Sequence, residues 1–170
     1  MGKHFTGYFI DRVSPEKNGN GMSKKLLFRW FGLGSIPKKL RPIFEAEQIV
    51  VADEGIGGRL ICRNVSGPGK RCINRSEGFT GCLVITKKRI VCFTYGKRQI
   101  NIAVNDPKIS DLMVGIPATG ILSISFESSV YRIGWEGRME FRFKTQKARQ
   151  FCDAMTSSGA RRIPMAPAGT

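Results

Sequence analysis

Histidine is the scarcest chemically active residue in this sequence, with one copy, His4, among 170 residues. Serine and cysteine hydrolases need a base beside their nucleophile, and His4 lies in a polar N-terminal stretch, so the sequence does not favour such enzymes. The phosphate-binding pattern GxxxxGK[ST] is also missing, because the glycines of SGPGKR are too closely spaced and no Ser or Thr follows. Paired acids such as Asp53 and Glu54 are expected on any solvated surface. We therefore expect a protein that is not an enzyme.

Long apolar runs are missing from the first thirty residues, so neither a secretory signal nor a membrane-spanning helix is expected there. Met1-Gly2 with Thr6 fits the short N-myristoylation pattern, which stays open as an alternative. The expected location is cytoplasmic, either free or peripheral at the inner membrane face.

Metal ligands are also few. Five cysteines are present, an odd number, and four of them recur every ten residues: Cys62, Cys72, Cys82 and Cys92, with Cys152 apart. None of them has the close spacing of a structural zinc site. We expect reduced, small apolar residues in strands, and we predict no metal and no cofactor.

Positive charge is abundant: 28 Lys and Arg stand against 13 Asp and Glu, for a formal net charge of +15. With 41% apolar residues the chain is long enough to bury a core as one domain with an extension. Such a basic field attracts phosphates, either on an acidic membrane or on nucleic acid. Composition does not choose between them.

Composition divides the chain into four parts. Residues 1–22 are typical of a flexible arm, and residues 159–170 of a disordered tail. Residues 44–158 carry the β-domain. The basic-aromatic segment 23–43 has lysine pairs on both sides of its apolar residues, which are Leu26, Leu27, Phe28, Trp30, Phe31 and Leu33. As a short helix it would dock either on the domain itself or on a membrane, with its aromatic residues and lysines at headgroup level.

From Gln48 onward the apolar residues follow a period of two, which is typical of antiparallel strands with one wet face. In RMEFRFK, for example, Met139, Phe141 and Phe143 alternate with charged residues. CLVIT and RIVCF are apolar on both faces, so we expect them at the centre of the sheet. The pattern predicts about seven strands, with an eighth at 130–135 left open; the seven are 58–64, 79–86, 89–94, 98–104, 110–114, 119–126 and 138–144.

One helix is predicted after the last strand, beginning at a Thr145 cap and ending before Gly159. Its single apolar stripe occupies positions i, i+3, i+4 and i+7, which are Ala148, Phe151, Cys152 and Met155. This stripe must be buried against the sheet. The expected fold is therefore mostly β, a strongly bent antiparallel sandwich or barrel capped by one C-terminal α-helix.

Three segments of the sequence resemble the pleckstrin-homology-like (PH-like) superfamily, in particular its GRAM and bacterial PH branches. GCLVITKKRIVCF resembles the hairpin signature, in which a glycine and an apolar strand ending in Thr are followed by two turn residues, Arg and a second strand. FEAEQIVVADEG resembles the lead-in, and FRFKTQKARQFCDAM the last strand with its capping helix. The resemblance covers roughly residues 44–158. It implies a PH-like fold that binds acidic lipid, including phosphoinositides, or a protein partner, or that mediates oligomerisation.

Successive strands reverse direction, so the basic residues are expected at two ends of the sheet. One end collects the candidate anion-binding residues, which are Lys70, Arg71, Arg75, Lys97 and Arg98. The opposite end carries a second basic turn, which is Lys87, Lys88 and Arg89. In phosphoinositide-binding relatives the first and third inter-strand loops form the cationic pocket, so the resemblance implies this role for Lys70, Arg71, Arg75 and Lys97.

The lipid motif of those relatives is matched only in part, by Arg63 and KRCINR. A diffuse attraction needs no motif, since each basic side chain near an acidic bilayer contributes about 1 kcal/mol. The function favoured by the sequence is a cytoplasmic module that docks on acidic phospholipid or on a protein partner. Nucleic-acid binding is the alternative, although Tyr95 is the one aromatic residue expected to be exposed beside charge. A homo-oligomer also stays open.

Overall fold

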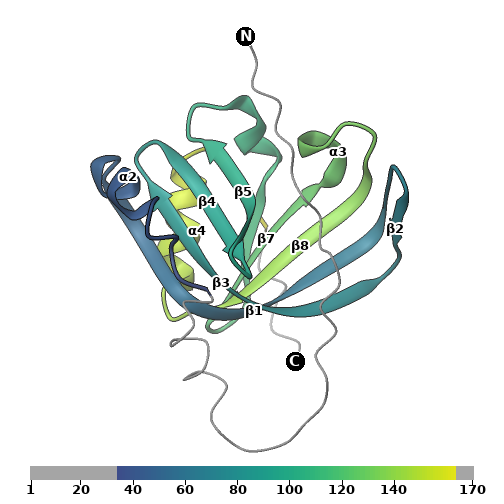
Figure 1. Ribbon diagram of the computed structural model, residues 1–170, viewed down its shortest axis with the longest axis horizontal. Helices are drawn as coiled ribbons and strands as arrows, with labels where there is room; N and C mark the ends of the chain where they lie inside the picture. Colours follow the sequence, from purple (N-terminus) through teal and green to yellow (C-terminus); the bar gives the residue numbers. More distant parts are fainter. Residues whose placement is uncertain (1–33, 164–170) are drawn as a thin grey trace, which may run out of the picture.

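The structure is a computed structural model, and it describes residues 34–163. Its nine strands are β1 (Ile49–Gly67), β2 (Lys70–Cys72), β3 (Arg75–Thr86), β4 (Arg89–Thr94), β5 (Lys97–Ala103), β6 (Met113–Ala118), β7 (Ile121–Glu127), β8 (Glu136–Lys144) and β9 (Arg161–Arg162). They form one curled sheet in the order β5-β4-β3-β1-β8-β7-β6-β9, with β2 paired to β1 alone (Figure 1). All pairs are antiparallel except β6 with β9.

The helical elements are short apart from the last. They are α2 (Arg41–Ala46), the 3-10 helix η1 (Pro107–Asp111), α3 (Ser128–Tyr131) and α4 (Ala148–Ser157). All four residues of the apolar stripe of α4 are buried. The Thr145 hydroxyl accepts a hydrogen bond from the backbone N–H of Lys147 at 3.1 Å, and Gly159 has a φ of +106° directly after the helix. The predicted helix is confirmed, but its N-cap residue is Lys147, so the Thr145 hydroxyl stabilises the turn before the helix and does not cap it.

The long strand β1 joins the two halves of the sheet. It pairs with β3 from Ile49 to Cys62 and with β8 from Gly58 to Ser66, so its central part has a neighbour on each side. Register shifts between Ile49 and Val51 and between Asp53 and Ile56 bend the strand. At Gly58 a side chain would collide with the ring of Phe79 and the Arg142 carbonyl. This close approach lets the sheet curl (Figure 1).

The concave side of the sheet holds the main core. Its aromatic centre includes Phe79 and Phe143, whose rings meet edge to face with centroids 5.2 Å apart. Phe151 and Met155 of α4 are fully buried in the same cluster. This cap covers apolar side chains that the curled sheet would otherwise leave open to water.

A second apolar cluster covers the convex side of β3 and β4. There Ile36 and Phe44, from the segment that contains α2, pack on strand side chains, which are Cys82, Val84, Val91 and Phe93. Both faces of these strands are therefore buried, as their apolar sequence suggests, but the predicted position at the centre of the sheet is wrong for β4, which lies next to the edge strand β5. Since Ile36 takes part in this cluster, residues 34–43 in the second part of the basic-aromatic segment pack on the sheet.

The mostly β class and the C-terminal helix are confirmed, but nine strands are present among the described residues rather than about seven. The predicted strand 110–114 is wrong in its first half, because the Asp106 carboxylate accepts from the N–H of Lys108 and begins a 3-10 helix. Residues 130–135 are not a strand, since α3 and a turn occupy them. Arg161–Arg162 form β9, so the disordered tail does not begin at residue 159.

Candidate anion-binding surface

The basic turn between β3 and β4 is held by the side chain of Thr86. Its hydroxyl oxygen accepts hydrogen bonds from the backbone N–H groups of Lys88 at 3.1 Å and Arg89 at 3.0 Å. The same hydroxyl donates to Oε2 of the buried Glu47 at 3.0 Å. These bonds fix the two-residue turn, Lys87-Lys88, while both lysine side chains are exposed.

Arg89 is bound to Glu47 by two hydrogen bonds. Nε lies 3.0 Å from Oε2, and Nη2 lies 2.5 Å from Oε1. The Glu47 side chain is 7% exposed and that of Arg89 36%. A two-point contact of this kind is among the stronger ion pairs in proteins. Arg89 therefore has a structural partner, whereas the side chains of Lys87 and Lys88 form no hydrogen bond or ion pair with residues 34–163.

An open groove of about 660 Å³ lies beside this turn on the convex side of the sheet. Its lining contains three cations and no acidic residue: Lys87, Lys88, Arg89, Asn101, Ala103, Val104 and Asn105. The Asn amide groups supply neutral hydrogen-bond donors at the end of β5. Positive charge, amide donors and the lack of acid in the lining suit an anionic group.

Exposed aliphatic side chains adjoin the lysine turn. Ile49 lies opposite Thr86, and the backbone N–H of Lys87 donates to the carbonyl groups of Glu47 and Gln48. Ile49, the following Val50 and Ile43 of α2 are 36%, 55% and 46% exposed. The edge of the molecule that carries Lys87 and Lys88 thus also presents apolar groups to solvent.

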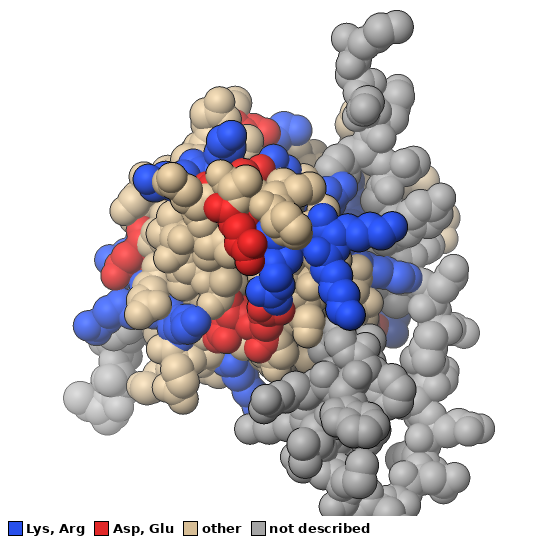
Figure 2. All heavy atoms as spheres, turned by 60° about the vertical axis from the view of Figure 1, so that its left-hand side comes forward, with Lys and Arg blue, Asp and Glu red and all other residues tan. Residues whose placement is uncertain are grey.

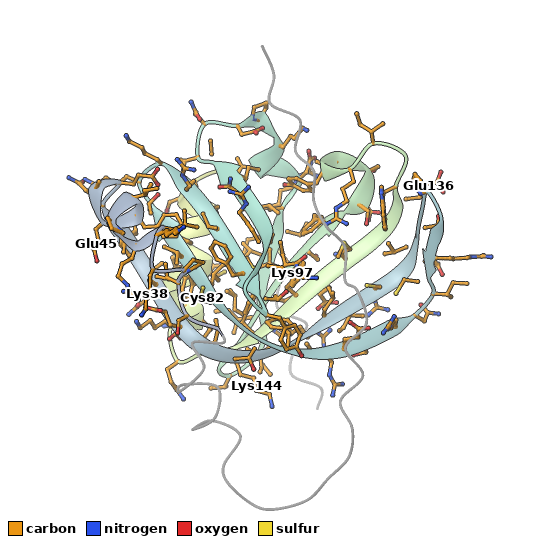
Figure 3. The ribbon with its side chains drawn as sticks, in the orientation of Figure 1. Lys38, Glu45, Cys82, Lys97, Glu136 and Lys144 are labelled. Carbon is orange, nitrogen blue, oxygen red and sulfur yellow. The ribbon has the colours of Figure 1, made fainter. Side chains whose placement is uncertain are left out.

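The five residues predicted as one anion-binding cluster lie in two groups. Arg71 of β2 lies opposite Ser66 of β1, and Arg75 is the first residue of β3. Lys97 of β5 instead pairs with Thr94 of β4, and Thr94 lies opposite Gly81 in the middle of β3. Six residues of extended strand separate Arg75 from Gly81, or about 20 Å. Figure 3 labels Lys97, which belongs to one group. It also labels Glu136, which lies beside the other group because both Glu136 and Arg71 pair with Ser66. The expectation that these residues form one cluster is therefore wrong, because Arg71 and Arg75 lie apart from Lys97 and Arg98.

Several of these cations have other partners or neighbours. Arg75 forms an ion pair with Glu77 on the same strand. Lys97 and Arg98 are exposed after the turn Tyr95-Gly96, where both residues have positive φ, as a two-residue hairpin requires. The Tyr95 hydroxyl donates to the Gly78 carbonyl, which holds the ring against β3. Figure 2 shows Lys and Arg in several separate groups, with acidic side chains among them.

The apolar residues Leu26 to Leu33 of the basic-aromatic segment lie outside the described residues, as do the flexible arm and residues 164–170. The backbone of Lys70 belongs to β2. The predicted roles of Lys70 and of the residues outside the described range stay predictions.

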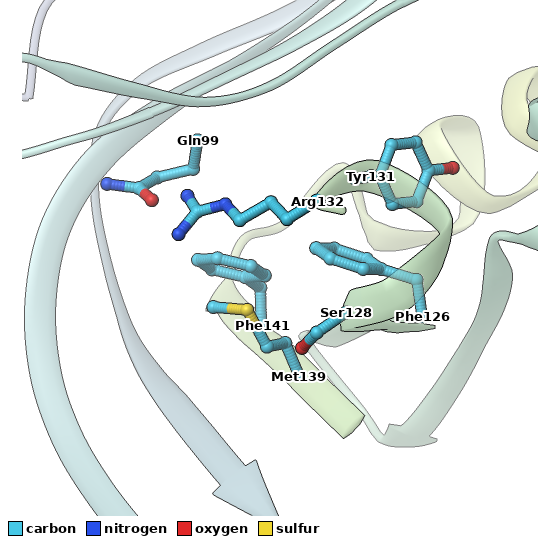
Figure 4. A pocket seen from close by; sticks show the side chains of 7 residues that line it. All are labelled: Gln99, Phe126, Ser128, Tyr131, Arg132, Met139 and Phe141. Atoms are coloured by element: carbon cyan, nitrogen blue, oxygen red, sulfur yellow. The ribbon is translucent and has the colours of Figure 1, made fainter. Parts of the chain in front are cut away.

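A small cavity of about 20 Å³ lies inside the concave side, between β5, α3 and β8. Figure 4 shows the Arg132 side chain extended toward Gln99 above the rings of Phe126 and Phe141. Burial lowers the pKa of the Arg132 guanidinium from its usual value. The Ser128 hydroxyl is fully buried and has no hydrogen-bond partner in the part of the chain that the structure describes. A cavity of this size holds about one water molecule, so it does not accommodate a substrate.

Three of the five thiol groups are held in the protonated, less reactive form. Burial raises the pKa of Cys62, which also lies next to Cys72, and of Cys82 to about 12 in each case. Burial likewise holds the pKa of Cys92 well above its ordinary value. Within residues 34–163 no group of three His, Cys, Asp or Glu side chains is placed to hold a metal ion. In the same part of the chain no helix is long and apolar enough to cross a bilayer.

Comparison with known proteins finds no protein-family model and no curated protein that match this chain. The resemblance to the PH-like superfamily therefore rests on the segments quoted above.

Proposed function

We propose that this chain is a non-catalytic, PH-like binding module that docks on acidic phospholipid surfaces through the lysine turn of β3 and β4. The observation that carries the proposal is the groove beside Lys87 and Lys88, whose lining has these two lysines, the Glu47-bound Arg89 and no acidic residue. The order β5-β4-β3-β1-β8-β7-β6 and the capping helix α4 support the PH-like part of the proposal.

The neighbouring aliphatic residues favour a membrane over a soluble anion. Ile49 and Val50 are exposed next to the lysines, and burying an exposed aliphatic side chain contributes about 25 cal/mol per Å² of apolar area. Basic side chains at headgroup level beside apolar side chains at the acyl boundary are the usual arrangement of interfacial proteins. The rigid turn presents both lysines without prior ordering, which lowers the entropic cost of binding.

The test is co-sedimentation with vesicles of phosphatidylcholine alone and of phosphatidylcholine with phosphatidylserine. Lys87→Ala/Lys88→Ala removes two contributions of about 1 kcal/mol each, so binding to the acidic vesicles should weaken about 30-fold. Lys97→Ala/Arg98→Ala removes the same charge at the other end of the β4–β5 pair and should leave most of the binding intact. Both variants should keep the thermal stability of the parent, because these side chains are exposed.

Equal losses of vesicle binding in the two variants would assign binding to net charge and would refute the groove as the binding site. Loss in the Lys97/Arg98 variant alone would return the site to the cluster predicted from sequence. Failure of the unmodified protein to sediment with acidic vesicles would refute membrane docking altogether.

A further inference from the structure

Two pairs of arginines lie directly opposite each other on the outer face of β1 and β8. Arg59 pairs with Arg142, and Arg63 pairs with Arg138. Side chains at directly opposed positions of an antiparallel pair have Cβ atoms about 5 Å apart, where like charges destabilise the sheet. The repetition of this arrangement four positions along each strand places four guanidinium groups on one face.

One carboxylate offsets these charges in part. Glu140, between Arg138 and Arg142 on β8, accepts from Nε of Arg142 at 2.6 Å and from the Ser123 hydroxyl at 2.9 Å. Arg138 donates to the Ser125 hydroxyl at 2.9 Å, which supplies no charge. Of the four arginines, Arg142 alone forms an ion pair within residues 34–163. The other three arginines form no ion pair within these residues, although the exposed Glu127 of β7 lies opposite Arg138.

Phosphate groups match this arrangement. A guanidinium pair offers parallel N–H donors that fit the oxygens of a phosphate, and the bound anion removes the repulsion between the pair. The two pairs are four residues apart along β1, or about 13 Å. Two arginine pairs at this separation suit a chain of phosphates better than a single phosphate.

The face also differs from the lysine turn in having nothing to insert into a bilayer. The exposed large hydrophobic residues of the described chain are Ile43, Ile49, Val50, Ile73, Tyr95 and Ile133, and none of them lies between 58 and 63 or between 138 and 142. The outward positions between the arginines are Ile61 and Glu140. With no aromatic side chain among them, this face has no platform for stacking bases.

We propose that the outer face of β1 and β8 is a second anion site that binds the phosphodiester backbone of nucleic acid through Arg59, Arg63, Arg138 and Arg142. Binding through phosphates alone is independent of base sequence and depends strongly on salt. This site goes beyond the membrane-docking function and does not require it, because the lysine turn contributes no residue to it.

The experiment measures fluorescence anisotropy of labelled oligonucleotides, with single-stranded RNA, single-stranded DNA and duplex DNA as separate arms, over a range of salt concentrations. Arg59→Ser/Arg63→Ser should lower affinity at every sequence tested. It should also reduce the slope of log K against log salt by about 1.4, because each lost phosphate contact of a single strand accounts for about 0.7. Lys38→Ser/Lys39→Ser removes equal charge from two exposed residues before α2 and is the matched control.

Thermal unfolding distinguishes a binding role from a structural one. Removing Arg59 and Arg63 relieves both opposed pairs, so the Tm of the ligand-free variant should rise by about 1 to 5 °C. Glu140→Gln should strengthen oligonucleotide binding, because it removes the carboxylate that lies between Arg138 and Arg142. Sedimentation of Arg59→Ser/Arg63→Ser with acidic vesicles should match the parent, whereas Lys87→Ala/Lys88→Ala should still bind the oligonucleotide.

Three results would overturn the proposal. A lowered Tm of Arg59→Ser/Arg63→Ser would make these arginines structural, and equal affinity losses in the control would reduce the effect to net charge. Loss of vesicle binding with retained oligonucleotide binding would make the face a lipid site. Failure of Lys87→Ala/Lys88→Ala to lose vesicle binding would refute the membrane proposal and leave this one standing.

Discussion

The ion pair between Glu47 and Arg89 should couple α2 to the β3–β4 turn, and substitution of either partner measures that coupling. Arg89→Leu leaves a carboxylate that is 7% exposed, with the Thr86 hydroxyl as its remaining hydrogen-bond donor among the groups described here. Breaking a fully buried ion pair costs about 3 to 5 kcal/mol. Because the Arg89 side chain is 36% exposed, the pair is partly solvated, and we expect a smaller loss of about 2 to 3 kcal/mol.

Glu47→Gln should be milder. The glutamine carbonyl can still accept from Thr86, and the partly exposed guanidinium can turn toward water, so we expect a loss of about 1 kcal/mol. The asymmetry between the two substitutions follows from the unequal burial of the partners. Lys88→Leu, at an exposed position of the same turn, is the control and should leave the free energy of unfolding within about 0.5 kcal/mol.

Urea unfolding of the two single variants and of Glu47→Gln/Arg89→Leu gives the coupling energy. The double variant should be less destabilised than the sum of the single variants, by about 1 to 2 kcal/mol, because the second substitution removes a group that the first left unpaired. Additive losses, or a larger loss for Glu47→Gln than for Arg89→Leu, would refute the reasoning that Arg89 serves the fold.

Two further predictions concern the thiols and acid stability. Cys72 should be the cysteine that a thiol reagent labels in the native state at pH 8, because it is only half buried while the other four are buried; Cys72→Ser should abolish the rapid phase, and unchanged labelling would contradict the burial. At Glu140, burial raises the pKa, but hydrogen bonds from Arg142 and Ser123 and the charges of Arg142 and Arg63 together hold it below its ordinary value. A lowered pKa stabilises the fold above the unfolded pKa of about 4.3 and loses that contribution as pH falls through the folded value. The Tm difference between the parent and Glu140→Gln should therefore be constant near neutral pH and shrink below about pH 4; a difference independent of pH would contradict the role of the charged form.

The elements that the sequence predicts well are those whose pattern of apolar and polar residues is complete within the element itself. Strand β8 alternates apolar and charged residues, and α4 carries its stripe at helical spacing, so each could be identified without knowledge of its neighbours. Residues 89–94 match β4 for a different reason, because a short apolar run bounded by turn residues indicates a buried strand. The apolar outer face of β3 and β4 was equally visible, although the sequence did not identify Ile36 and Phe44 as its cover.

The length of β1 could not be predicted from its pattern. Residues 49–57 include acids, two glycines and a break in alternation, because bulges shift the register and part of the strand lies outside the core. The length of β1 also affects the position of the basic residues. Strand β3 follows β1 for twelve residues, but β4 pairs with β3 only from Gly81 onward, so the two basic groups at the same nominal end of the sheet separate by about 20 Å.

The role of Arg89 shows a different limit. In the sequence it belongs to a basic knot with Lys87 and Lys88, and Glu47 is one of several acids in a charged lead-in. The two residues are 42 positions apart, and only the pairing of β1 with β3 brings them to hydrogen-bonding distance. A charge run therefore does not act as a unit. Here Glu47 binds the arginine and leaves the lysines exposed, so that the residue with the strongest affinity for phosphate is the one least available to it.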